Sequence, residues 1–244
     1  MKRFSLSILL LLLLISSTSS YKFLSKSFFE NQNLKYVLIS SKTLKKYLTD
    51  PKYYIIDTRE MATIALGYIP NTILIPSTMF SWLGAVVPDS SNVIIITDNT
   101  NKYETINSFI KLGKYKLIGY CIYDDIVNSS SFNIQQIVYN PNTYDSIQKI
   151  VDDNQNIIDI REVAEYINTG VIQQAKLIPL NTFKNNYVKV PKEGNVYVFC
   201  KSGGRAVVGM SYVKRAGYTN KFIIMRGGMD QAIKEGYPTV PYVE

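Results

Sequence analysis

The chain has 244 residues, of which 46% are hydrophobic and 19% are charged, and its formal net charge is +8. This length and apolar content suffice for a sizeable core in one or two domains, which excludes a disordered chain. The positive excess is divided between both halves of the sequence, with no basic arm and no arginine-rich stretch. The charge therefore gives no support to nucleic-acid binding.

Residues 1–20 have the pattern of a secretory signal peptide. Lys2 and Arg3 precede an apolar run over residues 8–15, and small residues follow up to Ser20. Because a membrane span needs about 20 apolar residues, this run is too short to be one. We expect cleavage near Ser20, entry into the secretory pathway or secretion, and no stable membrane insertion. An organelle reached through that route and mitochondria are the alternative destinations.

An internal repeat covers most of the remaining sequence. Residues 55–60, which read IIDTRE, recur as residues 157–162, which read IIDIRE, and weaker matches follow both segments in the same order. Such self-similarity at an offset of about 100 residues indicates a tandem duplication of one fold. We place the two copies at residues 21–127 and 139–244, joined by a linker at residues 128–138 that begins with serine and asparagine.

Both copies predict the same series of elements. A short apolar strand comes first, followed by a helix that ends at Gly67 or Gly170, a second strand that ends at Pro76 or Pro179, a third strand, a long helix and a fourth strand. Strands that are rich in isoleucine and valine on both faces, alternating with helices, are typical of a buried parallel sheet. The sequence therefore predicts an α/β fold with two domains, each a parallel sheet flanked by helices on both faces.

Two pairs of charged residues recur in the repeat. Asp57 and Arg59 of the first copy correspond to Asp159 and Arg161 of the second copy. Both copies keep these residues although only one copy has a cysteine in the position described below. We therefore interpret them as structural ion pairs that brace a turn.

The chain has two cysteines, Cys121 and Cys200, which is too few for a disulfide framework. Cys121 ends an apolar run of the first copy and is predicted to be a core residue. A single bridge between the two cysteines, or a redox-sensing pair, requires the two thiols to lie close together.

Cys200 is the candidate nucleophile because it follows a buried strand over residues 196–199 and precedes a glycine-rich turn and a helix. The residues after it are Lys201, Ser202, Gly203, Gly204 and Arg205. Backbone N–H groups at such a turn bind anions, and with the two cations they should lower the pKa of the thiol below its usual value of about 8.5. We predict that Cys200 is catalytic and that residues 201–205 bind substrate, with no cofactor and no metal.

The repeat and the cysteine loop together resemble the rhodanese (sulfurtransferase) family, as a tandem of two rhodanese domains. The matching motifs of the second copy are, in order, DIRE at 159–162, EYINTG at 165–170, LIP at 177–179, the loop at 200–205, RGG at 226–228 and GYP at 236–238. The first copy is similar through DTR at 57–59, GYIP at 67–70, IP at 75–76 and FSW at 80–82.

The resemblance implies that Cys200 transfers sulfane sulfur. The thiolate would attack the outer sulfur of thiosulfate or of a persulfide donor, become a persulfide, and pass the sulfur to a thiol or to cyanide. The alternative is a rhodanese-fold binding module or persulfide carrier without turnover. Arg205 lies five positions after Cys200, one fewer than in cysteine phosphatases, which predicts a ring too small for phosphate.

The sequence departs from the family pattern in two respects. It contains no histidine, whereas the family usually has one at the positions held here by Tyr68 and Val171. We interpret this change as a loss of local hydrogen bonding. Thr97 of the first copy stands at the position of Cys200 and Asp98 follows it. The first domain is therefore predicted to be catalytically inactive and to contribute a surface to the active-site cleft.

Overall fold

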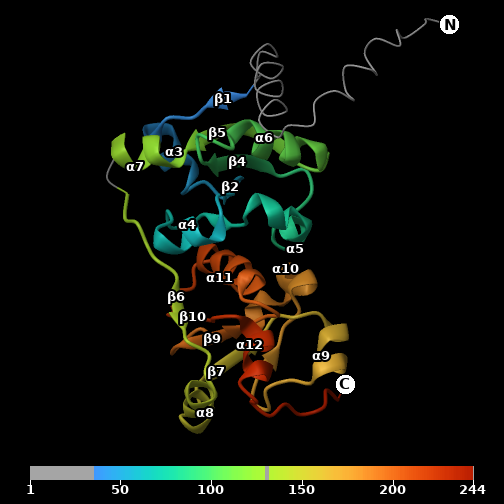
Figure 1. The fold of residues 1–244 in the computed structure, drawn as a ribbon. Helices are drawn as coiled ribbons and strands as arrows, with labels where there is room; N and C mark the ends of the chain where they lie inside the picture. Colours follow the sequence, from blue (N-terminus) through green and yellow to red (C-terminus); the bar gives the residue numbers. More distant parts are fainter. Residues whose placement is uncertain (1–35, 130–131, 244) are drawn as a thin grey trace, which may run out of the picture. The chain divides into compact units, whose positions relative to one another are not determined.

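A computed structural model describes residues 36–129 and 132–243 (Figure 1). The predicted signal peptide at residues 1–20 lies outside these ranges. Within them, no helix is both long enough and apolar enough to cross a membrane. Residues Val37–Glu244 group together as one compact unit.

The first copy forms a parallel sheet of five strands in the order β1-β5-β4-β2-β3. These strands are β1 (Val37–Leu38), β2 (Tyr53–Asp57), β3 (Ile73–Leu74), β4 (Asn92–Thr97) and β5 (Lys116–Ile122). The helices between and after them are α3 (Ser41–Tyr47), α4 (Met61–Leu66), the 3-10 helix η1 (Ser77–Trp82), α5 (Leu83–Val86), α6 (Lys102–Lys111) and α7 (Tyr123–Ser129).

The second copy repeats this sheet in the equivalent order β6-β10-β9-β7-β8, again parallel. Its strands are β6 (Val138–Asn140), β7 (Asn156–Asp159), β8 (Lys176–Leu177), β9 (Val196–Phe199) and β10 (Phe222–Met225). Its helices are α8 (Tyr144–Asp152), α9 (Val163–Thr169), η2 (Leu180–Thr182), α10 (Phe183–Asn186), η3 (Tyr187–Lys189), α11 (Gly204–Arg215) and α12 (Gly228–Lys234). The predicted fold class, two α/β domains with parallel sheets, is confirmed.

Each copy has one strand more than the sequence predicted. The additional strands are β1 and β6, which pair with β5 and β10 at an edge of their sheets. Val37 and Leu38 of β1 are 64% and 56% exposed, so this strand has no buried apolar run by which it could be recognised. The strand β6 begins at Val138 and α7 extends to Ser129, so regular structure reaches into both ends of the predicted linker at 128–138.

Helices cover both faces of each sheet (Figure 1). Side chains alternate along every strand, and the apolar side chains on each face pack against helices. In the first sheet, Ile55 and Ile94 pack with α3 and α7, whereas Ile56 and Ile95 belong to the cluster on the opposite face. The second sheet divides in the same way. Its Ile157 face packs with α8 and α12, and its Ile158 face packs with α11 and α10.

One apolar cluster joins the inner faces of the two copies. It contains Ile73 and Leu83 of the first copy together with Phe183, Val207 and other residues of the second. Helix α11 lies in this cluster and also contacts β3 of the first copy. Eight of its twelve residues are buried, as expected for a helix that is apolar on almost every side.

The recurrent charged pairs brace equivalent turns, as predicted. The guanidinium of Arg59 lies 2.7 Å from the carboxylate of Asp57 and donates to the carbonyl oxygen of Gly67 at 2.7 Å. Arg161 lies 2.7 Å from Asp159 and donates to the carbonyl oxygen of Gly170 at 2.8 Å. Each pair therefore ties the end of a central strand to the end of the following helix.

Candidate active site

Cys200 directly follows β9 and lies at the start of a tight turn. The N–H of Gly203 donates to its Sγ at 3.1 Å, and the residue is 1% exposed. Gly203 has a φ of 106°, a backbone conformation that residues other than glycine rarely adopt. Helix α11 begins at Gly204, so the turn and the first turn of the helix enclose the sulfur, as the sequence predicted.

The predicted lowering of the thiol pKa is not found. Burial raises the pKa of Cys200 above its usual value, and this effect exceeds the opposing effects of the Ala206 and Gly203 N–H groups and the Arg205 guanidinium. The sequence shows the groups that stabilise a thiolate, but it does not show how completely the loop excludes water. The prediction is therefore wrong for the resting thiol in this closed loop.

Arg205 is held by a carboxylate. Its Nη1 and Nη2 donate to the two carboxylate oxygens of Glu165 at 2.6 and 2.7 Å. The Arg205 side chain is 9% exposed and that of Glu165 is 27% exposed. Arg205 lowers the pKa of Glu165, which therefore stays ionised and neutralises much of the positive charge. Arg205 ties the loop to α9, a contact that was not predicted, and it is less available to a bound anion than predicted.

Glu165 is a site residue that the sequence reasoning named only as part of a motif. It occupies the third position of α9 and closes a capping box with Glu162 at the start of that helix. The capping pattern could have located Glu165 on the first turn of the helix. It could not have shown that this turn faces the Cys200 loop.

Lys201 and Ser202 are exposed, unlike the other predicted site residues. The carbonyl oxygen of Lys201 accepts a hydrogen bond from the N–H of Asp230 at 3.0 Å. These two residues are the part of the predicted substrate-binding loop that solvent reaches.

A second glycine turn supports the cysteine loop from behind. The N–H of Met229 donates to the carbonyl oxygen of Cys200 at 2.8 Å. Gly228, at φ 57°, lies so close to the carbonyl oxygens of Cys200 and Lys201 that a Cβ atom would overlap them. Arg226, at the start of this turn, is exposed, and its guanidinium lies over the ring of Tyr139, 5.2 Å from the centroid.

The first copy contributes side chains beside the loop, as predicted. The Arg205 guanidinium lies over the ring of Trp82, 5.0 Å from its centroid. The sulfur of Met79 lies 3.2 Å from the position that a Cβ atom on Gly204 would occupy. The loop of the second copy thus packs against apolar side chains of the first.

Strand register shows that Thr97 is the counterpart of Cys200. Ile96 pairs with Asp57 in the first sheet, and Phe199 pairs with Asp159 in the second. Thr97 and Cys200 are therefore the next residues of equivalent strands. Thr97 is buried, and the predicted replacement of the thiol by a hydroxyl is confirmed.

Cys121 is a core residue, as predicted. It is fully buried, and burial raises its pKa to about 12. Both cysteines are free thiols, and they belong to different apolar clusters on different sheets. The structure therefore has no bridge between them.

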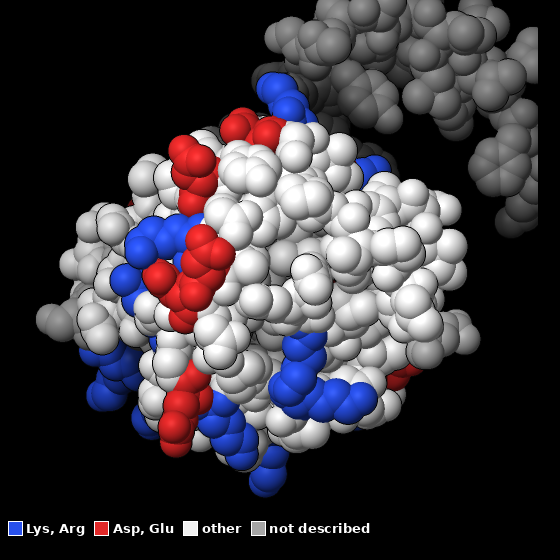
Figure 2. Space-filling view, turned by 90° about the horizontal axis from the view of Figure 1, so that it is seen from below, with Lys and Arg blue, Asp and Glu red and all other residues white. Residues whose placement is uncertain are grey.

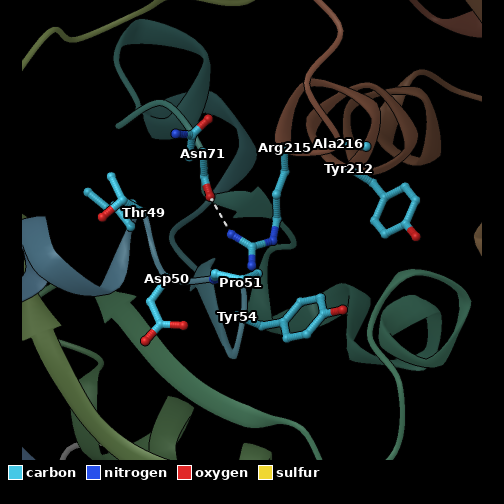
Figure 3. Close-up of a pocket in the computed structure, with 9 residues that line it drawn as sticks. Thr49, Asp50, Pro51, Tyr54, Asn71, Tyr212, Arg215 and Ala216 are labelled. Atoms are coloured by element: carbon cyan, nitrogen blue, oxygen red, sulfur yellow. Dashed lines mark hydrogen bonds between the residues drawn. The ribbon is translucent and has the colours of Figure 1, made fainter.

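A pocket lies between the copies at the other end of α11. It has a volume of about 460 Å³ and contains Arg215. Figure 3 shows the Arg215 side chain beside Tyr54, with a hydrogen bond to the backbone of Asn71. Nη2 of Arg215 also donates to the carbonyl oxygen of Tyr53 at 2.6 Å. Arg215 thus joins the two copies.

Charged side chains are mixed on the face of the molecule shown in Figure 2. Lysine and arginine lie beside aspartate and glutamate, and a wide uncharged area crosses the middle of this face. The face therefore has no large patch of one sign. Within residues 36–129 and 132–243, no cluster of three or more metal-binding side chains is present.

In this parallel α/β domain a cysteine follows a central strand, and a glycine turn leads from it into a helix. This arrangement defines a class of proteins that hold an anion or a reactive sulfur at the turn. Residues 143–235 match the family model of the rhodanese-like domain. The second copy is therefore a rhodanese-like domain, and the first copy has the same strand order.

Individual relatives match the chain over different lengths. A sulfurtransferase from Allochromatium vinosum is 29% identical over 98 residues, which are 39% of this chain and 90% of that protein. A rhodanese-like domain protein from Staphylococcus aureus is 27% identical, covers 40% of this chain and 95% of its own, and has a TM-score of 0.35. A thiosulfate sulfurtransferase from Pseudomonas aeruginosa is 15% identical, covers 85% of this chain and 45% of its own, and has a TM-score of 0.39.

Proposed function

We propose that the chain is a sulfurtransferase that moves sulfane sulfur from thiosulfate or a persulfide donor to a thiol or cyanide through a persulfide on Cys200. The observation that carries the proposal is the placement of Sγ within a turn of backbone N–H groups, 3.1 Å from that of Gly203. The match of this copy to the rhodanese-like domain and the sulfurtransferase from A. vinosum support the same function.

The chemistry needs two displacement steps and no external oxidant. The Cys200 thiolate attacks the outer sulfur of thiosulfate, an S–S bond forms, and sulfite leaves with the electron pair of the broken bond. An acceptor thiolate or cyanide then attacks the outer sulfur, and the Cys200 thiolate is released. The Gly203 N–H stabilises the sulfur anion before the first step and after the second.

The thiol must lose its proton before it attacks. Because burial raises the pKa of Cys200, only a small fraction is thiolate at neutral pH. The proton goes to solvent, and the exposed Lys201 and Ser202 provide the side from which solvent and the anionic donor approach. The rate of sulfur transfer should therefore rise with pH above neutrality.

In the proposed function, the first copy supports the site but carries no sulfur. Thr97 in place of the thiol makes it inactive as a sulfur carrier, because a hydroxyl does not form a persulfide. Met79 and Trp82 form an apolar wall beside Gly204 and Arg205. This wall would favour compact donors over bulky ones.

The test is a thiocyanate-detection assay with thiosulfate and cyanide on the full chain. Wild type should turn over, Cys200→Ser should have no measurable activity, and Cys121→Ser should keep the wild-type rate because Cys121 lies in a separate core cluster. Activity that persists in Cys200→Ser would contradict the assignment.

A persulfide carrier without turnover is the second candidate, and the 1% exposure of Cys200 favours it. A sulfur enclosed to this degree could be retained rather than passed on. Intact-mass spectrometry after incubation with thiosulfate distinguishes the two functions. A gain of one sulfur that persists when cyanide or glutathione is added would identify the carrier, and its loss would identify the enzyme.

A further inference from the structure

We propose that Asn142 is a positioning residue for Cys200, because its side-chain amide fixes the glycine turn on which the cysteine loop rests. The inference deepens the sulfur-transfer function proposed above and rests on it. Asn142 is fully buried, just after β6, and its backbone has a φ of 63°. It does not contact the sulfur, so any effect on chemistry acts through the turn.

The amide of Asn142 holds both ends of the turn. Its Nδ2 donates to the carbonyl oxygen of Arg226 at 3.0 Å and to that of Gly228 at 2.7 Å. The residue between these two, Gly227, has a φ of 74°. A turn of two glycines in this conformation is flexible without such contacts, so one side chain fixes its shape.

The turn then fixes the cysteine loop through two hydrogen bonds. The N–H of Met229 donates to the carbonyl oxygen of Cys200 at 2.8 Å, and that of Asp230 donates to Lys201 at 3.0 Å. These bonds set the orientation of the peptide groups that lead to Gly203. Displacement of the turn would therefore move the Gly203 N–H away from the sulfur.

Asn142 combines two unfavourable features at one position. A residue other than glycine at positive φ is uncommon, and its Oδ1 is buried with no hydrogen-bond partner among the described residues. Features of this kind persist where the surrounding structure or its function requires them. The two bonds to the glycine turn are the contacts that this conformation makes possible.

The first copy lacks the same residue where it lacks the thiol. Strand register places Ile39 at the position of Asn140, and the helix caps Ser40 and Thr143 follow one and three residues later. The second copy is therefore two residues longer here, and Asn142 has no counterpart in the first copy. Strand register places Tyr123 at the position of Gly227. The asparagine and the glycine turn thus occur together, in the copy that carries the cysteine.

The experiment compares Asn142→Gly with Asn220→Ala in the full chain. Glycine tolerates the positive φ and removes only the side chain. Asn220 is a matched control: it is 7% exposed, its Nδ2 donates to the carbonyl oxygen of Gly194 at 3.1 Å, and its Oδ1 also lacks a partner. It precedes β10, at the end of the sheet opposite to Cys200.

The first readout is the rate of Cys200 alkylation by iodoacetamide against pH, followed by peptide mass spectrometry to separate Cys200 from Cys121. In Asn142→Gly the pH of half-maximal rate should rise, because the thiolate loses its aligned N–H donor. The second readout is thiosulfate turnover, where kcat should fall about fivefold and KM should change less than about twofold. Asn220→Ala should lower the thermal midpoint and change neither readout.

A wild-type alkylation profile in folded Asn142→Gly, or an equal shift in Asn220→Ala, would overturn the proposal. Asn142→Asp keeps the size and the tolerance of positive φ but removes both donors, so its profile should move in the same direction. If neither variant at Asn142 folds, the residue acts on stability alone and the proposal is wrong. Alkylation reports on the thiol even if wild type transfers no sulfur. Failure of the proposed sulfur-transfer function can therefore be distinguished from failure of the proposed role of Asn142.

Discussion

At the scale of single residues, the charge nearest to the sulfur is already paired. Arg205 makes two hydrogen bonds to Glu165 and lies over the Trp82 ring, so its guanidinium is held along one edge and on one face. A planar fork of this kind positions the loop more than it attracts a substrate. The mobile positive charge at the loop is that of the exposed Lys201.

Replacement of Glu165 should test this pairing. In Glu165→Gln the free energy of unfolding should fall by about 1–3 kcal/mol, because the nearly buried guanidinium of Arg205 loses its counter-ion. The control is Asp153→Asn, which breaks the pair with Lys149 in which both side chains are at least 47% exposed. That variant should change the stability by less than about 0.5 kcal/mol. Urea denaturation of both variants measures the difference, and equal losses would contradict the structural role of Glu165.

At the scale of elements, the start of α12 and the start of α11 are built together. Helix α11 begins directly after the cysteine turn, and α12 begins at Gly228, which touches the carbonyl oxygen of Cys200. The close approach requires a residue without a side chain on the second turn. Two loops that are distant in sequence thus make one support for the sulfur.

Gly228→Ala should therefore disrupt the site strongly. The added Cβ would overlap the backbone of Cys200 and Lys201, and the positive φ adds strain. We expect a large loss of stability, and we expect the pH profile of Cys200 alkylation to differ from that of wild type. Gly113→Ala is the control, because Gly113 has a φ of 64° with no atom within 4 Å of the added group. It should cost about 1 kcal/mol, and thermal unfolding of the two proteins would show the contrast.

At the scale of the whole molecule, the two copies share one apolar cluster across their inner faces. Arg215 at the end of α11 and Ser211 within it add polar contacts, since Ser211 Oγ accepts from the N–H of Leu74 at 3.0 Å. The copies therefore meet in a packed interface rather than through the linker alone. Separation of the copies would expose this cluster to water.

Arg215→Ala should weaken the interface. The carbonyl oxygen of Tyr53 loses its donor and the Tyr54 ring loses the guanidinium 4.8 Å from its centroid. We expect the free energy of unfolding to fall by about 1–3 kcal/mol. Lys111→Ala removes an exposed cation from the last turn of the equivalent helix α6, and it should change the stability by less than about 0.5 kcal/mol. Chemical denaturation that gives equal changes would show that Arg215 does not hold the copies together.

The sequence predicted most of the fold because each strand, helix and turn pattern occurs twice, once in each copy of the repeat. Buried strands rich in isoleucine and the Asp-Arg pairs appear in both copies, and the structure places them in equivalent positions. The edge strands β1 and β6 were missed because they are short and contain no buried residue, so no apolar periodicity marks them.

The location of the site at Cys200 was predicted from the sequence, but the tertiary contacts and the burial around the thiol were not. The cysteine, the glycine turn and the helix start are contiguous in sequence, and strand, turn and helix follow from local pattern. Glu165 and Asn142 were not recognised because their contacts with the site are formed by tertiary packing. The pKa of Cys200 was predicted in the wrong direction for the same reason, since burial depends on elements that are far apart in the chain.

Helix α11 is covered on both sides, so the first copy matters to the fold although it has no thiol at the position of Cys200. The α11 residues Val207 and Val208 are fully buried in a cluster to which the first copy contributes. Deletion of the first copy would leave the second copy with an unprotected hydrophobic surface and a tendency to aggregate. The first copy therefore keeps a structural role in covering α11, whatever residue stands at position 97.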